Sequence, residues 1–188
     1  GPDDYKELNL PLSNLSNNSK IFLQGIFNRL SIIDLSEEAS QPMISDKYKT
    51  ILFFNGEIFN HNELRKELEK DGEVFKTNHS DSEVVLIGLS KYGEDYINKF
   101  NGQFAITFID SKTDSIYLIR DRLGQKPLFY SISNSNLFFG SNLISVSKLS
   151  KNKKTDENQL LNYLNLGVVP SPKTIIKNIN KVEPGSVI

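Results

Sequence analysis

The chain has 188 residues, of which 38% are hydrophobic and 24% charged, as in an ordinary soluble globular protein. The formal net charge of −1 gives no reason to expect binding to nucleic acid or to an anionic membrane surface. No apolar run approaches the roughly 20 residues that span a bilayer, and no signal peptide is visible, so we expect a cytoplasmic location. Cysteine is absent, which excludes disulfides and thiolate metal sites and removes the strongest nucleophile for amide chemistry.

The first elements are predicted from turn residues and short apolar runs. In chain order we expect a polar loop over 5–19, strand segments at 21–26 and 30–33 with a break at Asn28-Arg29, a loop over 37–45, and a strand at 50–54. Asn55-Gly56 then follows the last apolar run and is a strong turn signal.

Helices are predicted in the middle of the chain, at 61–70, from Ser80 to Gly93, and at 94–99. Ser80 and Glu83 have the spacing of a capping box, in which each residue satisfies a backbone N–H of the other. Asp71-Gly72 and Gly93 end the first two helices.

The rest of the chain is predicted as an antiparallel meander followed by helices and an extended tail. The strands are expected at 103–109, 116–120, 128–132 and 137–140, and the helices at 142–149 and 156–166, the latter capped by Thr155 and ended by Gly167. The proline-containing segment 170–185 is expected to be extended and outside the core. Strands, then helices, then strands predict an α+β fold with sheets packed in layers.

Three groups could carry chemistry, although each also has a structural explanation. Asn55-Gly56 can direct N–H donors at a developing oxyanion, but it can also be a plain hairpin turn. Arg29 suits a carboxylate, or an ion pair with Asp34. Asp81, at a helix start, can bind an ammonium group or simply favour the helix dipole. Together they describe a glutamine pocket, although spacing alone does not show that they converge.

Seven blocks in order over residues 1–149 resemble the class II glutamine amidotransferase domain of asparagine synthetases. They are Gly-Pro-Asp-Asp (1–4), Arg-Leu-Ser-Ile-Ile-Asp-Leu (29–35), Gln-Pro-Met (41–43), Phe-Asn-Gly-Glu-Ile-Phe-Asn-His (54–61), Ser-Asp-Ser-Glu (80–83), Asn-Gly-Gln-Phe-Ala (101–105) and Arg-Asp-Arg-Leu-Gly-Gln-Lys-Pro-Leu-Phe-Tyr (120–130). The tail blocks 166–174 and 181–185 resemble the connection into a synthetase domain.

The resemblance implies an N-terminal-nucleophile hydrolase-type fold, a four-layer αββα sandwich of antiparallel sheets that lacks its first strands here. It implies that 1–149 is an N-terminally truncated glutamine amidotransferase domain and that 150–188 is a linker with the start of the synthetase domain.

The resemblance also assigns roles to individual positions. Arg29 would bind the glutamine α-carboxylate, and Asn55 and Gly56 would form the oxyanion hole. Glu57 and Asp81 would hold the α-ammonium group. The backbone of the segment after Arg29 would line the same pocket: Leu30, Ser31, Ile32 and Ile33. The blocks 101–105 and 120–130 would be structural, with Asp121 and Arg122 in ion pairs.

The nucleophile of this family is a cysteine at the mature N-terminus, which is expected upstream of Gly1, so the 188 residues alone are expected to be inactive. No Ser-Gly-Gly-x-Asp-Ser loop is present, so no cofactor is expected in this chain, and ATP and Mg²⁺ are expected in the synthetase domain. His61 and His79 are too few for a metal site and suit hydrogen bonds at helix starts.

The expected function is hydrolysis of L-glutamine to supply ammonia for ATP-dependent amidation of aspartate. The expected partner is the C-terminal synthetase domain of the same protein, and a homodimer is a further candidate. Two alternatives stay open from the sequence: an amidotransferase that acts on a polysaccharide sugar or related acceptor, and a non-catalytic binding module of the same fold.

Overall fold

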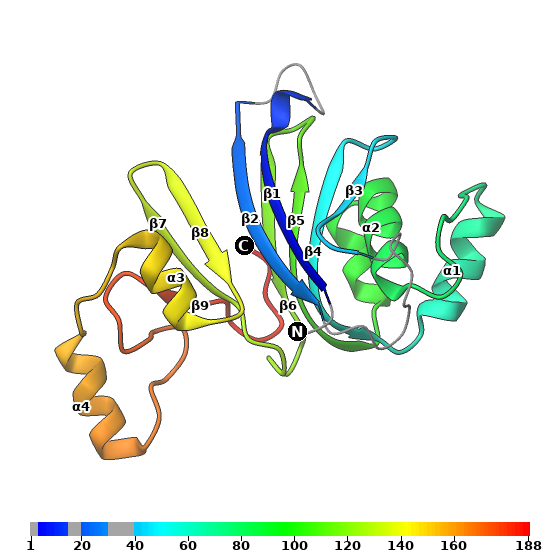
Figure 1. Cartoon of the computed structure of the whole chain (residues 1–188). Coiled ribbons are helices and arrows are strands. Elements are labelled where there is room, and N and C mark those ends of the chain that lie inside the picture. The colour runs from blue at the N-terminus through cyan, green and yellow to red at the C-terminus, as the bar shows by residue number, and fades with distance from the viewer. Residues whose placement is uncertain (1–3, 15–19, 30–39) are drawn as a thin grey trace. The chain divides into compact units, whose positions relative to one another are not determined.

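The computed structural model describes residues 4–14, 20–29 and 40–188 (Figure 1). The chain forms two compact units, one made of Gly1–Gly102 with Ile106–Tyr117 and the other of Gln103–Ala105 with Leu118–Ile188. In chain order the elements are β1 (Asp4–Pro11), η1 (Leu12–Asn14), β2 (Phe22–Arg29), β3 (Met43–Ser45), β4 (Thr50–Ile58), α1 (His61–Lys70), α2 (Asp81–Tyr92), η3 (Glu94–Lys99), β5 (Gly102–Asp110), β6 (Ser115–Arg120), β7 (Phe129–Ser133), β8 (Asn136–Gly140), α3 (Leu143–Ser150), α4 (Glu157–Leu166) and β9 (Asn180–Lys181).

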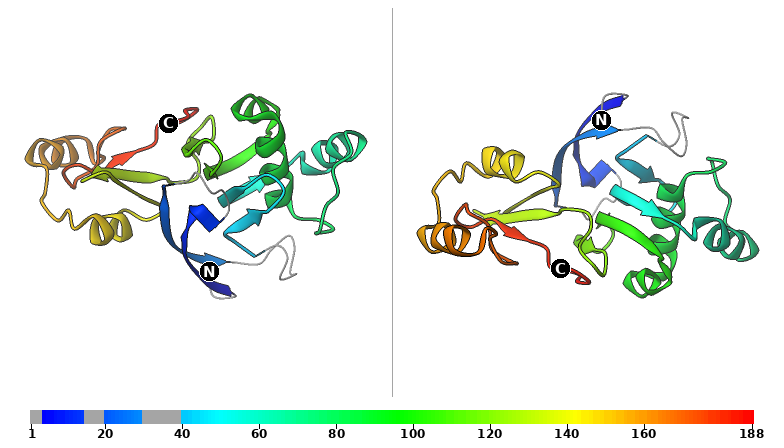
Figure 2. Two further views of the ribbon diagram at one scale, coloured as in Figure 1. Left: turned by 90° about the horizontal axis from the view of Figure 1, so that it is seen from above. Right: turned by 90° about the horizontal axis from the view of Figure 1, so that it is seen from below.

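The first unit is layered around β4. Strands β1 and β2 form an antiparallel hairpin, and the larger sheet has the order β3-β4-β5-β6. Figures 1 and 2 show β4 between this hairpin and helix α2. The hairpin approaches closely at Gly25, where a Cβ would lie 2.9 Å from Cζ of Phe53 on β4. A larger residue at position 25 would therefore push the hairpin away from β4.

Burial explains why β4 and α2 form the centre of this unit. Four consecutive β4 residues, from Ile51 to Phe54, are buried, as expected for a strand covered on both faces. Helix α2 is buried at every residue from Asp81 to Leu89. Helix α1 is amphipathic by contrast, and it buries Leu64 and Leu68 on one face.

The second unit contains a three-stranded sheet of order β8-β7-β9, in which both pairs are antiparallel. Helix α3 packs on β7 and β8. The hydrophobic core of the second unit includes Ala105, Leu118, Leu128 and Val182. Helix α4 buries none of its residues. Among the described residues, every helix is too short or too polar to cross a bilayer.

The helices were predicted well because their boundaries depend on neighbouring residues. Helix α1 begins at His61 and ends before Asp71, and α2 is capped by Ser80 and ends at Gly93. The third predicted helix is the 3₁₀ helix η3. The predicted helix at 156–166 is α4, but its cap is Asp156, whose side chain accepts from two backbone N–H groups, rather than Thr155.

The loop predictions near the N-terminus were wrong. Residues 4–11 pair with 22–29 along the whole hairpin, so β1 replaces the expected loop and β2 continues through Asn28-Arg29 without a break. The predicted strand 30–33 lies outside the described residues. Part of the expected loop 37–45 is β3, which pairs with β4. Cross-strand pairing decides these elements, and the composition of a single segment does not show it.

The predicted meander and tail also differ from the structure. Strands β5 and β6 belong to one sheet, whereas β7 and β8 belong to another. The tail is partly core, because Thr174, Ile179 and Val182 are buried and β9 pairs with β7. The proline-containing tail therefore adds a strand to the second sheet.

Candidate functional site

Asn55, Gly56 and Glu57 lie within β4, so the predicted turn at Asn55-Gly56 is wrong. The strand runs through Ile58, and Gly56 has φ 157°. Side chains alternate along a strand, so Asn55 and Glu57 share the face of Phe53, which is the face toward the hairpin. Asn55, Gly56 and Glu57 are only partly buried, whereas Phe54 and Ile58 on either side of them are buried.

The carboxylate of Asp81 is held at the end of β4. Asp81 is the first residue of α2 and is 5% exposed. Its Oδ2 accepts the backbone N–H of Ile58 at 3.1 Å. Since Ile58 directly follows Glu57, the fold brings together two residues that are 24 positions apart in the sequence.

The pKa of Asp81 depends on its burial and on the groups around it. Burial raises the pKa of Asp81, the Ile58 N–H and His61 oppose this rise, and the charge of Glu57 adds to it. Within the described residues neither Glu57 nor Asp81 forms a salt bridge. A buried carboxylate next to a second negative charge favours a cation as its ligand.

Gln41 connects both parts of the candidate site, a contact that the sequence did not predict. Its buried carboxamide bonds to both backbone groups of Phe54 and to Oγ of Ser82. Phe54 directly precedes Asn55, and Ser82 directly follows Asp81. The segment had been expected to be a loop, and the family block 41–43 was the only sequence signal at this position.

Strand β5 also holds the end of β4. A Cβ at Gly102 would lie 2.2 Å from the carbonyl oxygen of Glu57, so only glycine permits this approach. Phe59 donates its N–H to the Asn101 carbonyl at 2.8 Å. The Asn60 side chain accepts from the Asn101 N–H at 3.0 Å and donates to the carbonyl of Lys99 at 2.9 Å. The block 101–105 is therefore structural, as predicted, and it supports Glu57.

The predicted residues for the glutamine α-carboxylate are only partly covered by the structure. Arg29 is the last residue of β2, and its backbone pairs with Asp4. Figure 1 shows β2 and β4 ending on the same side of the first unit. Leu30, Ser31, Ile32 and Ile33 lie outside the described residues, and their role stays a prediction.

The start of α2 is fixed by buried polar contacts. Ser80 Oγ accepts the N–H of Glu83 at 3.4 Å, which is half of the predicted capping box. The carboxylate of Glu83 instead accepts from Lys76 N–H at 2.8 Å and from Thr77 N–H and Oγ1 at 2.8 and 2.6 Å. The other half of the box is thus replaced by bonds to the preceding loop.

His61 has the predicted role at a helix start, because Nδ1 lies 2.8 Å from the Ile58 carbonyl oxygen. No cluster of His, Cys, Asp and Glu suited to a metal ion occurs in the described part of the chain.

Asp121 has a structural role, which its carboxylate performs by accepting hydrogen bonds from backbone N–H groups. Its buried carboxylate accepts N–H groups from four residues: Phe104, Leu123, Gln125 and Lys126. Burial alone would raise the pKa of Asp121, but these bonds outweigh it and lower the pKa. Across residues 4–14, 20–29 and 40–188 Asp121 forms no ion pair, and its carboxylate instead organises a turn. The predicted ion pair of Arg122 stays a prediction.

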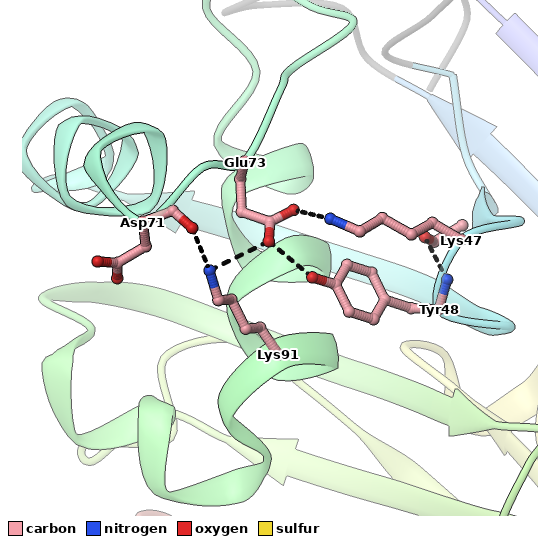
Figure 3. A network of polar contacts seen from close by, with 6 residues as sticks. Lys47, Tyr48, Asp71, Glu73 and Lys91 are labelled. Atoms are coloured by element: carbon pink, nitrogen blue, oxygen red, sulfur yellow. Dashed lines mark hydrogen bonds and ion pairs between the residues drawn. The ribbon is translucent and has the colours of Figure 1, made fainter.

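Glu73 is a second buried carboxylate of the first unit, and it is surrounded by donors (Figure 3). Lys47 Nζ lies 2.6 Å from Oε2, and Tyr48 OH and Lys91 Nζ lie 2.7 and 3.1 Å from Oε1. Lys91 also donates to the Asp71 carbonyl at 2.7 Å. Burial by itself raises the pKa of Glu73, but the three donors lower it to about 2. We call Glu73, Lys47, Tyr48 and Lys91 the Glu73 cluster; it joins the β3–β4 turn to α2.

Comparison with known proteins shows the family of this chain. Residues 17–188 match the family described as a glutamine amidotransferase domain. Glutamine-hydrolyzing asparagine synthetase 1 of Bacillus subtilis is 38% identical over 160 residues, which cover 85% of this chain and 25% of that protein. Putative glutamine-hydrolyzing asparagine synthetase 2 of Methanocaldococcus jannaschii is 34% identical over 172 residues, covering 82% and 33%. The chain thus spans a quarter to a third of the length of these relatives.

A solved structure supports the fold class. The structure described as the allosteric regulatory enzyme of purine biosynthesis has a TM-score of 0.50 and 17% identity, covering 73% of this chain and 25% of that chain. This similarity concerns the fold alone. It confirms the predicted α+β sandwich of antiparallel sheets and helices.

Proposed function

We propose, since the chain belongs to the glutamine amidotransferase domain family, that it is the glutaminase part of a longer asparagine synthetase-like enzyme. It would hydrolyse L-glutamine and supply ammonia for the ATP-dependent amidation of aspartate. One observation supports the proposal: the N–H of Ile58, the residue after Glu57, donates to the buried carboxylate of Asp81 at 3.1 Å.

The proposed roles follow from the chemistry of each group. Glu57 and Asp81 hold the α-ammonium group of glutamine, and Arg29 holds its α-carboxylate. Asn55 and the N–H of Gly56 donate hydrogen bonds to the amide oxygen as it becomes an oxyanion. Support for the first role comes from the charge of Glu57, which adds to the raised pKa of Asp81, and from the lack of a salt bridge between either carboxylate and another described residue.

The reaction needs a nucleophile that these residues do not contain. A thiolate would attack the amide carbon, ammonia would leave, and water would hydrolyse the thioester to glutamate. The 188 residues contain no cysteine, so a cysteine nucleophile has to come from outside them. We propose that these residues alone bind glutamine without hydrolysing it.

The acceptor reaction is proposed for the rest of the longer protein, where ATP and Mg²⁺ would be used. The relatives extend well beyond the matched region, which is 25% of one and 33% of the other. Helix α4 exposes several large apolar side chains that a following domain could cover, namely Leu161 (58%), Leu164 (70%) and Leu166 (62%).

The test uses the natural protein that contains these residues. We expect it to release glutamate from L-glutamine and to form asparagine from aspartate and ATP, whereas the 188-residue chain should release no glutamate. If the natural protein does not hydrolyse glutamine, the proposal is wrong. If it hydrolyses glutamine but amidates a sugar and not aspartate, only the proposed acceptor is wrong.

A further inference from the structure

The side chain of Gln41 uses both of its N–H donors and its carbonyl oxygen on the two segments of the candidate site. It is 6% exposed. Oε1 accepts the N–H of Phe54 at 2.6 Å, and Nε2 donates to the Phe54 carbonyl at 3.0 Å and to Ser82 Oγ at 3.3 Å. A primary amide has two N–H donors, and both are used here. One side chain therefore holds the chain beside Asn55 and beside Asp81.

The Gln41 carboxamide makes the two hydrogen bonds to Phe54 that the backbone of a longer β3 would otherwise make. Strands β3 and β4 pair with Met43 opposite Leu52, and the same register continued by two residues would set position 41 opposite Phe54. The ladder ends at Met43, and Pro42 has no N–H to donate. The Gln41 side chain instead supplies one acceptor and one donor to Phe54, as a peptide group of a neighbouring strand would.

We infer that Gln41 is a positioning residue for glutamine hydrolysis, an inference that rests on the proposed function. By holding Phe54 and Ser82 together, it fixes Asn55-Gly56 relative to Asp81. Such positioning matters because a displacement of about 1 Å in an active site can lower the rate about 100-fold. Gln41 touches no reacting atom and acts through the segments that it binds.

Gln41→Glu tests the role of the amide with little change in shape. A carboxylate has no N–H donor, so the bonds to the Phe54 carbonyl and Ser82 are lost, and a negative charge faces that carbonyl oxygen. The end of β4 is then free to shift relative to α2.

A matched control exists on the same strand and the same helix. Thr50 Oγ1 and Ser90 Oγ lie 2.7 Å apart and join the start of β4 to the last part of α2. Thr50 is 2% exposed, so Thr50→Val removes a partly buried bond between the same two elements and keeps the shape of the side chain. It is far along β4 from Asn55, so it tests loss of β4–α2 contacts without displacement of the site.

The experiment compares both variants in the whole natural protein, at a temperature where circular dichroism shows them folded. Gln41→Glu should lower kcat for glutamine about 10- to 100-fold, whereas Thr50→Val should leave kcat unchanged. Ammonium chloride in place of glutamine should restore product formation by Gln41→Glu, because it bypasses glutamine hydrolysis. Equal kcat values for glutamine in the two variants would overturn the inference.

Three further outcomes also bear on the inference. If Gln41→Glu does not fold, Ser82→Ala, which removes one of the three bonds, replaces it. A kcat/KM for glutamine below that of Thr50→Val then supports the inference, and an equal value overturns it. A wild-type protein without glutaminase activity contradicts the proposed function, and the inference falls with it. An active wild type with an unaffected Gln41→Glu contradicts the inference alone.

Discussion

Buried carboxylates lie at both ends of α2, and their surroundings differ. Near the last turn of the helix, the carboxylate of Glu73 accepts hydrogen bonds from two lysines and a tyrosine, which lower its pKa to about 2. At the first turn, burial raises the pKa of Asp81, and Asp81 forms no salt bridge to a described residue that would offset the cost of burying its charge. The Glu73 cluster therefore stabilises the fold, whereas the charge of Asp81 opposes folding and remains available to a ligand.

This difference separates stability from binding along one helix. A substitution in the Glu73 cluster should lower stability and leave glutamine affinity intact in the folded protein. A substitution at Asp81 should weaken glutamine binding and leave stability intact. Asp81 begins α2, and Glu73 contacts Lys91 near the end of the same helix, so the comparison controls for general damage to α2.

The largest effect is expected for Asn55→Ala. Loss of one oxyanion-hole donor typically costs about 2.7–4 kcal/mol, or roughly 10²–10³ in kcat. The natural protein carrying this variant should keep its KM for glutamine and its unfolding temperature. Steady-state kinetics with glutamine measures this, and an unchanged kcat would remove Asn55 from the proposed oxyanion hole.

Asp81→Asn should weaken glutamine binding without loss of stability. A hydrogen bond to a charged group contributes about 1.5–3 kcal/mol, so kcat/KM should fall about 10- to 100-fold. The amide oxygen of asparagine can still accept the N–H of Ile58. Kinetics and a thermal melt on the same sample measure both effects.

The pH dependence of stability follows from the raised pKa of Asp81. The protonated form is favoured in the folded state, so stability is lost as pH rises from below 3.8 through the raised pKa. At pH 7 Asp81→Asn should therefore unfold at the same or a higher temperature than the wild type, and below pH 3.8 any gain should disappear. A large fall in unfolding temperature at pH 7 would show that the charge of Asp81 stabilises the fold.

Glu73→Gln should destabilise the protein by about 2 kcal/mol at pH 7, because a carboxylate with a lowered pKa is replaced by a neutral group. The folded pKa lies below the ordinary value, so this stability is present above pH 4.5 and is lost as pH falls toward about 2. Urea unfolding at pH 7 and at pH 3 measures the difference, which should shrink at pH 3. A constant difference would mean that packing and not charge explains the effect.

The smallest effect is expected for Lys47→Met. The Lys47 side chain is 63% exposed, and Tyr48 and Lys91 continue to donate to Glu73 without it. The unfolding temperature should fall less than in Glu73→Gln. Added salt should also reduce the difference from wild type, since exposed ion pairs are screened. A fall as large as that of Glu73→Gln would place most of the stabilisation on one lysine.

The helices of the first unit could be predicted from the sequence because their signals are local. Ser80 lies next to the first residue of α2, and Gly93 follows its last. A cap depends on a few neighbouring residues, and these are visible in any single sequence.

The sheet around the candidate site could not be predicted in the same way. The Asn55-Gly56 pair favours a turn locally, but pairing and burial keep β4 extended through Ile58. Gln41 finds its partners 13 and 41 residues away, and no local pattern indicates such contacts. The resemblance to amidotransferases predicted Glu57 and Asp81 as a pair. The structure shows the hydrogen bond from Ile58 that holds Asp81 at the end of β4.

The most direct test of the account is a calorimetric titration of L-glutamine into the 188-residue chain, which contains no cysteine. The wild type, Asp81→Asn and Glu73→Gln are compared at a temperature where all three are folded. The account predicts saturable binding by the wild type and Glu73→Gln, and strongly weakened binding by Asp81→Asn. Equal binding by Asp81→Asn and the wild type, or no binding by the folded wild type, would contradict it.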